Sequence, residues 1–70
     1  MIKADAAQVS WDAHKKTWTV RIQIGEEVLK RPAGKKVPRD AADEQLRSLA
    51  IDTAHGDGYE IEPATVTIQR

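Results

Sequence analysis

Residues 18–24 read Trp-Thr-Val-Arg-Ile-Gln-Ile, so apolar and polar side chains alternate along this stretch without interruption. Successive side chains of a β-strand point to opposite faces, and the alternation therefore predicts a strand with one apolar and one polar face. The apolar face should carry Trp18, Val20, Ile22 and Ile24. The polar face should carry Thr19, Arg21 and Gln23. A strand polarised in this way must lay its apolar side against another element, which constrains the rest of the chain.

A hairpin is expected immediately before this strand. Residues 7–11 alternate in the same way, and the polar connector 12–17 predicts a β-hairpin with an irregular loop. Trp11 and Trp18 would then face each other on the apolar side of the sheet. There they either close the core or offer a stacking platform for a nucleic-acid base.

Further strands are expected on the C-terminal side. After a reversal at Gly25, residues 27–31 predict a short, charged edge strand that the next proline ends. Near the end of the chain, alternation resumes over residues 59–61 and again over residues 64–68. The change of phase at Pro63 predicts a break between these two pieces, of which the second is the better strand.

One helix is expected between the third strand and these last segments. Asp40 is the predicted N-cap, with Asp43 three residues later in a pattern similar to a capping box. The helical pattern runs to residue 54, and Gly56 is the predicted C′ glycine. Ile51 lies nearly opposite the apolar face, so either this face is broad or Ile51 is an exposed contact residue. The buried face should consist of Ala42, Leu46, Leu49, Ala50 and Thr53.

The elements together predict a single α+β domain over residues 1–70. Its order is β-β-β-α-β, in a small, mostly antiparallel sheet of three to four strands. One helix should cover one face of the sheet, and the last strand should pair beside the first. Residues 1–6 carry no periodic signal and should be frayed or form a short lead-in. The face open to water should display Ser10, Thr19, Arg21, Gln23, Thr65 and Thr67.

Residues that carry catalytic or metal chemistry are few and scattered. His14 falls in the hairpin loop and His55 at the helix end, where it suits the role of a C-terminal cap. Ser10 and Ser48 lie in no nucleophile motif, and residues 52–58 do not fit a calcium-binding loop. We therefore expect no enzyme, no metal and no cofactor, and no small-molecule substrate is evident.

The composition excludes several further classes of protein. The chain contains no cysteine, which rules out disulfides, cysteine-ligated zinc and thiol nucleophiles. No window approaches the roughly 18 apolar residues that a membrane-spanning helix needs. These features lead us to expect a soluble, cytoplasmic protein without a membrane partner.

Charge is balanced overall but unevenly distributed. Residues 1–39 hold nine Lys/Arg against four Asp/Glu, and residues 40–70 hold two against seven. The segment Lys30–Arg39, joined by the hairpin loop, is a candidate for phosphate contacts. The alternative is that these cations only keep an edge strand and a loop soluble. The candidate nucleic-acid contacts are Lys15, Lys16, Arg21, Lys30, Arg31, Lys35, Lys36 and Arg39.

The order of segments from Trp11 to Ala54 is similar in outline to a known class of fold. It resembles the three-stranded sheet plus helix of AP2-like and integrase N-terminal DNA-binding domains, without a shared motif. The resemblance implies a sheet that lies in a groove of DNA. Those domains line the reading sheet with several arginines and tryptophans, whereas the expected open face here has one arginine and several threonines.

We expect from the sequence a non-enzymatic interaction module. It would bind a protein partner, or a second copy of itself, through the sheet edge or the open sheet face. The alternative is nucleic-acid binding through Lys30–Arg39 and the loop residues Lys15 and Lys16. The candidate protein contacts are Thr19, Arg21, Gln23 and Ile51.

Overall fold

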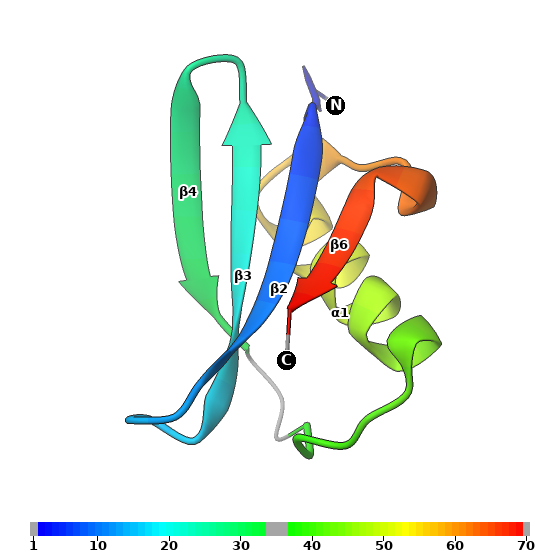
Figure 1. Ribbon diagram of the computed structural model, residues 1–70. Helices are drawn as coiled ribbons and strands as arrows, with labels where there is room; N and C mark the ends of the chain where they lie inside the picture. Colours follow the sequence, from blue (N-terminus) through cyan, green and yellow to red (C-terminus); the bar gives the residue numbers. More distant parts are fainter. Residues whose placement is uncertain (1, 34–36, 70) are drawn as a thin grey trace.

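The computed structural model describes residues 2–33 and 37–69 and has one helix packed across a four-stranded sheet (Figure 1). The strand order in this sheet is β4-β3-β2-β6. β3 pairs antiparallel with both of its neighbours, and β6 pairs parallel with β2. The predicted α+β architecture is therefore confirmed, and the last strand, β6, lies beside β2, the first strand predicted from the sequence. The elements of this layer pair are β2 (Ala6–Asp12), β3 (Thr17–Ile24), β4 (Glu27–Pro32), α1 (Asp43–Gly56) and β6 (Val66–Gln69).

The two hairpins of the sheet close through different turn chemistry. Between β3 and β4 the chain reverses in two residues, and Gly25 supplies the positive φ of 60° that such a turn needs. Between β2 and β3, the carboxylate of Asp12 accepts hydrogen bonds from the backbone N–H groups of His14 (2.9 Å) and Lys15 (3.2 Å). Lys16 then takes the left-handed conformation, with φ 53°.

The core lies between α1 and one face of the sheet. Trp18 is fully buried, and its indole Nε1 donates a hydrogen bond to the carbonyl of Pro38 at 2.9 Å. Trp11, opposite it in the register, packs edge-to-face at 5.3 Å between ring centroids. The two rings thus close the core, and the buried Trp18 is not available to stack on a base. The largest fully buried side chains are Trp18, Ile22, Leu46, Val9 and Val20.

The helix is one place where the structure corrects the sequence analysis. Its N-cap is Ala42, which makes no side-chain hydrogen bond, so the predicted N-cap Asp40 is wrong. Asp40 instead lies in a separate turn in which the N–H of buried Ala41 bonds to the carbonyl of Pro38. This turn delays the helix until Asp43. At the other end the left-handed residue is Gly58, with φ 86°, rather than Gly56, which is still helical.

The buried face of α1 is also displaced from the predicted one. Ala54 is buried, whereas Ala42 is exposed and Thr53 is half-buried with its hydroxyl bonded to the carbonyl of Leu49. Ile51 is half-buried, so it is neither a core residue nor a fully exposed contact. The buried residues of the helix are Leu46, Leu49, Ala50 and Ala54.

Residues 2–5 belong to the segment that the sequence predicted to be frayed or a short lead-in, and they are paired with distant parts of the chain. β1 (Ile2–Lys3) pairs in parallel with β5 (Tyr59–Glu60), and the next residue, Ala4, is buried with its N–H bonded to the carbonyl of Glu60 at 2.8 Å. The N–H of Asp5 bonds to the carbonyl of Gln23 at 2.9 Å. Backbone pairing with distant residues thus holds a segment that has no periodic pattern of its own.

The last segment starts later than the alternation indicated. η1 (Pro63–Thr65) is a short 3-10 helix, and β6 begins only at Val66. The hydroxyl of Thr65 is bonded to the carbonyl of Glu62 at 2.8 Å, so Thr65 precedes the strand instead of lying on it. Within the described ranges, no helix is long and apolar enough to cross a membrane.

Candidate functional site

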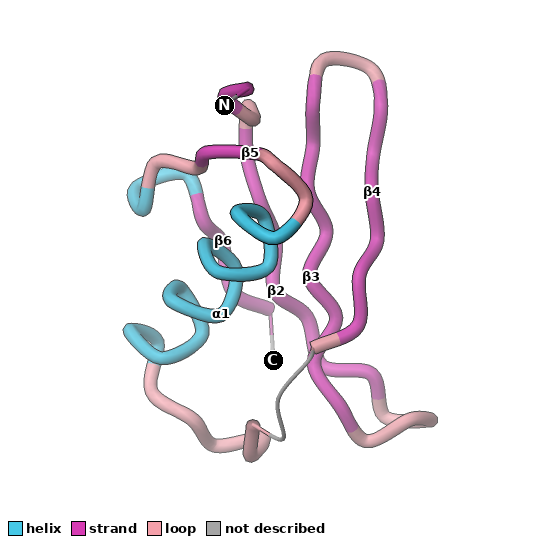
Figure 2. The backbone as a smooth tube through the Cα atoms, turned by 180° about the vertical axis from the view of Figure 1, so that it is seen from behind, coloured by secondary structure: helices cyan, strands magenta, loops and turns pink. Residues whose placement is uncertain are grey.

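One face of the sheet is covered by no helix in the described part of the chain, and we call it the open face. α1 packs on the opposite side, as the view from behind shows (Figure 2). All open-face side chains are exposed or half-buried. The open face consists of Ala6, Gln8 and Ser10 from β2, Thr19, Arg21 and Gln23 from β3, Val28, Lys30 and Pro32 from β4, and Thr67 and Gln69 from β6.

Two hollows lie next to each other on the open face. The larger has a volume of about 600 Å³ and the smaller of about 440 Å³. Gln8 and Arg21, which lie opposite each other in the register, line both hollows. The hollows therefore form one continuous uneven surface across the strands, which suits an extended partner better than an enclosed small molecule.

Arg21 and Lys30 form the electrostatic centre of this surface, because they lie directly opposite each other on β3 and β4. Hydrogen-bonded and non-hydrogen-bonded residue pairs alternate along two antiparallel strands. The bond from the N–H of Ala33 to the carbonyl of Trp18 (2.9 Å) shows which pairs of β3 and β4 are hydrogen-bonded. It makes Arg21 and Lys30 a pair without mutual backbone hydrogen bonds, for which Cα atoms are about 4.5 Å apart. Like charges directly opposite each other destabilise a sheet.

Neither of these cations has an acidic partner among the described residues. The ion pairs in residues 2–33 and 37–69 are Lys3–Glu62 at 3.2 Å and Arg31–Asp57 at 3.0 Å. Among the described residues that line these two hollows, Asp12 is the only one with an acidic side chain. Its carboxylate is held by the hairpin loop, and the hydrogen bond from the Lys15 N–H lowers the pKa of Asp12 below its ordinary value of 3.8. The Arg21–Lys30 pair is thus uncompensated.

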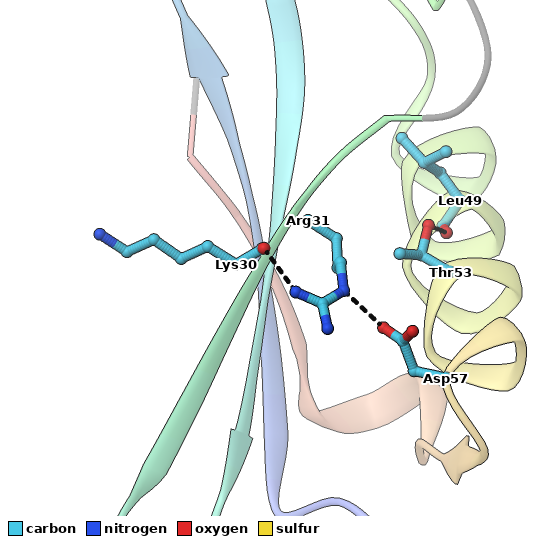
Figure 3. Close-up of polar contacts among 5 residues, drawn as sticks. All are labelled: Lys30, Arg31, Leu49, Thr53 and Asp57. Atoms are coloured by element: carbon cyan, nitrogen blue, oxygen red, sulfur yellow. Dashed lines mark hydrogen bonds and ion pairs between the residues drawn. The ribbon is translucent and has the colours of Figure 1, made fainter.

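The basic segment predicted from the sequence does not form one patch in the described part of the chain. Lys30 points to the open face, whereas the side chain of Arg31 turns toward the helix (Figure 3). There the Arg31 guanidinium binds Asp57 through Nε and the carbonyl of Lys30 through Nη1, at 3.0 and 3.2 Å. Lys35 and Lys36 lie outside the described residues.

The remaining predicted cations divide in the same way. Lys15 and Arg31 line the larger hollow together with Arg21 and Lys30. Lys16 is exposed in the hairpin loop and lines neither hollow. Arg39 is exposed in the turn that precedes α1. The structure thus brings together cations that are far apart in sequence and separates neighbours in the segment.

The free edge of β4 is poorly suited to accept a further strand. Val28, Lys30 and Pro32 belong to the pairs that are not hydrogen-bonded to β3, so their backbone N–H and C=O groups point away from β3, toward the free edge. Proline has no N–H to donate, and the carbonyl of Lys30 already accepts the bond from Arg31. β6, at the opposite edge, is only four residues long. The geometry therefore favours the open face over the sheet edges as a binding surface.

Three of the four predicted protein contacts lie on the open face. These are Thr19, Arg21 and Gln23, whereas Ile51 lies on α1, on the other side of the sheet. Gln8, Gln69 and Val28 also lie on the open face and were not predicted from the sequence. Gln8 Nε2 donates to Gln69 Oε1 at 2.8 Å across β2 and β6. The alternation of apolar and polar residues at positions 7–11 and 66–69 could have placed both glutamines on the open face.

Metal-ligating side chains do not gather in the described ranges. No group of three or more His, Asp or Glu residues there could hold a metal ion. Comparison with protein-family models, curated proteins and solved structures gave no match.

Proposed function

We propose that this protein is a cytoplasmic, non-enzymatic interaction module that binds a protein partner through its open face. The observation that carries this proposal is the uncompensated Arg21–Lys30 pair in the middle of an uncovered, uneven sheet surface. Two cations held opposite each other cost folding stability, and a partner that brings an anion removes this cost. The absence of cysteine suits a reducing compartment.

The chemistry around the cation pair supports binding rather than catalysis. Its neighbours on the open face are mainly amide and hydroxyl side chains, which donate and accept hydrogen bonds but form no nucleophile–base pair. They present hydrogen-bonding groups at intervals along several strands, as an extended polypeptide partner requires. These neighbours are Gln8, Ser10, Thr19, Gln23, Thr67 and Gln69.

Two matched variants test which surface binds. Ser10→Tyr places a ring in the larger hollow, and Ser48→Tyr makes the same change on the exposed side of α1. We expect a partner captured from nuclease-treated lysate of the native cells, and then purified, to bind wild type and the Ser48 variant equally. Binding to the Ser10 variant should fall at least about tenfold, which corresponds to about 1.4 kcal/mol. Equal binding by both variants would contradict the proposal, provided that the Ser10 variant retains the native NMR spectrum.

Nucleic-acid binding is the second candidate, because Lys15, Arg21 and Lys30 converge on one hollow. Phosphate contacts by such cations give affinity that falls steeply with salt and is indifferent to sequence. A labelled duplex should then bind at low salt, and Lys15→Gln and Lys30→Gln should each reduce the salt dependence. Replacing Lys35 and Lys36 by Glu tests the part of the basic segment outside the described residues.

A further inference from the structure

We infer that the Arg21–Lys30 pair is a carboxylate-binding subsite, and that the partner of the open face presents an extended acidic peptide segment. The inference rests on the proposed function and names the chemistry of the partner. Both side chains are exposed on the open face and have no acidic partner in the described ranges. A partner carboxylate between them would meet two positive charges at once.

The two cations differ in a way that suits a carboxylate. The guanidinium of Arg21 is a planar fork that binds both oxygens of a carboxylate, and the Lys30 ammonium adds a mobile point charge. Gln8 lies opposite Arg21 on its other side, and Thr19 lies two residues away on the same face. These groups can hydrogen-bond the peptide backbone that carries the carboxylate.

The position of Lys15 extends the subsite along the strand. Lys15 lines the same hollow from the hairpin loop, and Arg21 lies four residues beyond Thr17, the first residue of β3. Four residues of strand correspond to roughly 14 Å. An extended peptide covers this length of β3 in about four residues. Acidic side chains farther along such a peptide would meet Lys15 in the loop at the end of β3.

The structure favours an acidic peptide over a nucleic acid in two respects. Trp11 is the aromatic residue that lines the larger hollow among the described residues, and its ring is half-buried and packs edge-to-face on buried Trp18. The two hollows therefore offer no series of rings on which successive bases could stack. Arg31 also lines the larger hollow, but its guanidinium is paired with the Asp57 carboxylate, so its charge is compensated within the chain. A few cations within a chain of zero net charge suit a short acidic segment better than a long polyanion.

The test measures binding of a labelled peptide of alternating Glu and Ser by fluorescence anisotropy. A peptide of alternating Gln and Ser, and a single-stranded oligonucleotide of equal charge, serve as comparisons. We expect the Glu peptide to bind and the Gln peptide not to bind. Arg21→Gln and Lys30→Gln should each weaken binding of the Glu peptide about tenfold, since each removes a charged hydrogen bond. Lys3→Gln, which removes the same charge from β1, should leave binding within about twofold of wild type.

Lys30→Glu gives a second readout that does not depend on loss of structure. The new carboxylate lies opposite Arg21 and occupies the subsite from within the chain. This variant should fail to bind the Glu peptide and should also unfold at a higher temperature than wild type, because an opposite-charge pair replaces a like-charge pair.

Several outcomes would overturn the inference. Equal effects of Lys3→Gln and Lys30→Gln would mean that only net charge matters. Tighter binding of the oligonucleotide than of the Glu peptide would assign the subsite to phosphates. If self-association of the protein displaces the Glu peptide and so lowers its anisotropy, the subsite would be assigned to a second copy of the chain. If Ser10→Tyr prevents binding of the native protein partner while Lys30→Glu does not, the open face binds without this subsite. If neither change affects that partner, the proposed function itself is wrong.

Discussion

At the scale of single residues, Gly58 determines how the helix ends. It is the first left-handed residue after α1, with φ 86°, and a Cβ built there meets no atom within 4 Å. Gly58→Ala should therefore lower the free energy of unfolding by about 1–2 kcal/mol through backbone strain alone. Gly56 is helical and equally open, so Gly56→Ala should raise it by about 0.5–1 kcal/mol. Urea denaturation measures both, and a loss at Gly56 as large as that at Gly58 would refute this assignment.

Asp12 gives the hairpin loop a dependence on pH. The hydrogen bond from the Lys15 N–H lowers the pKa of Asp12 below 3.8 in the folded protein. A lowered carboxyl pKa contributes stability above the unfolded value, and this contribution is lost as pH falls through the folded value. NMR titration should find the Asp12 midpoint below 3.8, and stability of Asp12→Asn should decline less than that of wild type in the same acid range. A midpoint at or above 3.8 would contradict the observed loop geometry.

At the scale of elements, one ion pair among the described residues joins β4 to the end of α1, in addition to the packing of Leu29 against the core. The side chains of Arg31 and Asp57 are 45% and 28% exposed, so solvent screens their attraction substantially. A double-mutant cycle with Arg31→Ala and Asp57→Ala should give a coupling energy of about 0.2–1 kcal/mol at low salt, and less at high salt. Zero coupling at low salt would mean that the pair does not connect β4 to α1.

The pairing of β3 with β4 contains the unfavourable contact on which the proposed function rests. Lys30→Gln removes the positive charge opposite Arg21 and should raise the free energy of unfolding at low salt by about 0.2–1 kcal/mol. The gain should shrink as salt is added, because ions already screen the repulsion in wild type. Lys3→Gln is the control, since it breaks the ion pair with Glu62 and should give no gain. A Lys30 variant no more stable than wild type would show that the two cations do not repel each other.

At the scale of the whole molecule, the sequence predicted the strands and their order better than the ends of elements. The alternation of apolar and polar residues identified β2 and β3, because in each strand every second side chain is buried in the core. β1 could not be found, because two residues paired with distant Tyr59 and Glu60 leave no periodic signal. Asp40 was misassigned because its local pattern fits an N-cap, whereas the tertiary contact of Trp18 with Pro38 favours a separate turn there.

The residues of the open face were predictable only in part for a similar reason. The alternation of apolar and polar residues along β3 identified Thr19, Arg21 and Gln23 as residues of the open face. The pairing of Arg21 with Lys30 depends on the register between two strands, which the turn at Gly25 fixes. The side chain of Arg31 turns toward the helix because it binds Asp57, which lies at the end of α1. A run of cations in sequence was therefore a poor guide to a patch of cations in space.

NMR titration of isotope-labelled protein with the Glu–Ser peptide determines whether the open face binds an acidic partner. We expect chemical-shift changes to concentrate at open-face positions of β2, β3 and β4, above all at Gln8, Arg21 and Lys30, and we expect α1 to stay unaffected. These changes should disappear in Lys30→Glu. Chemical-shift changes that concentrate on α1, or a spectrum unchanged at saturating peptide, would contradict binding at the open face.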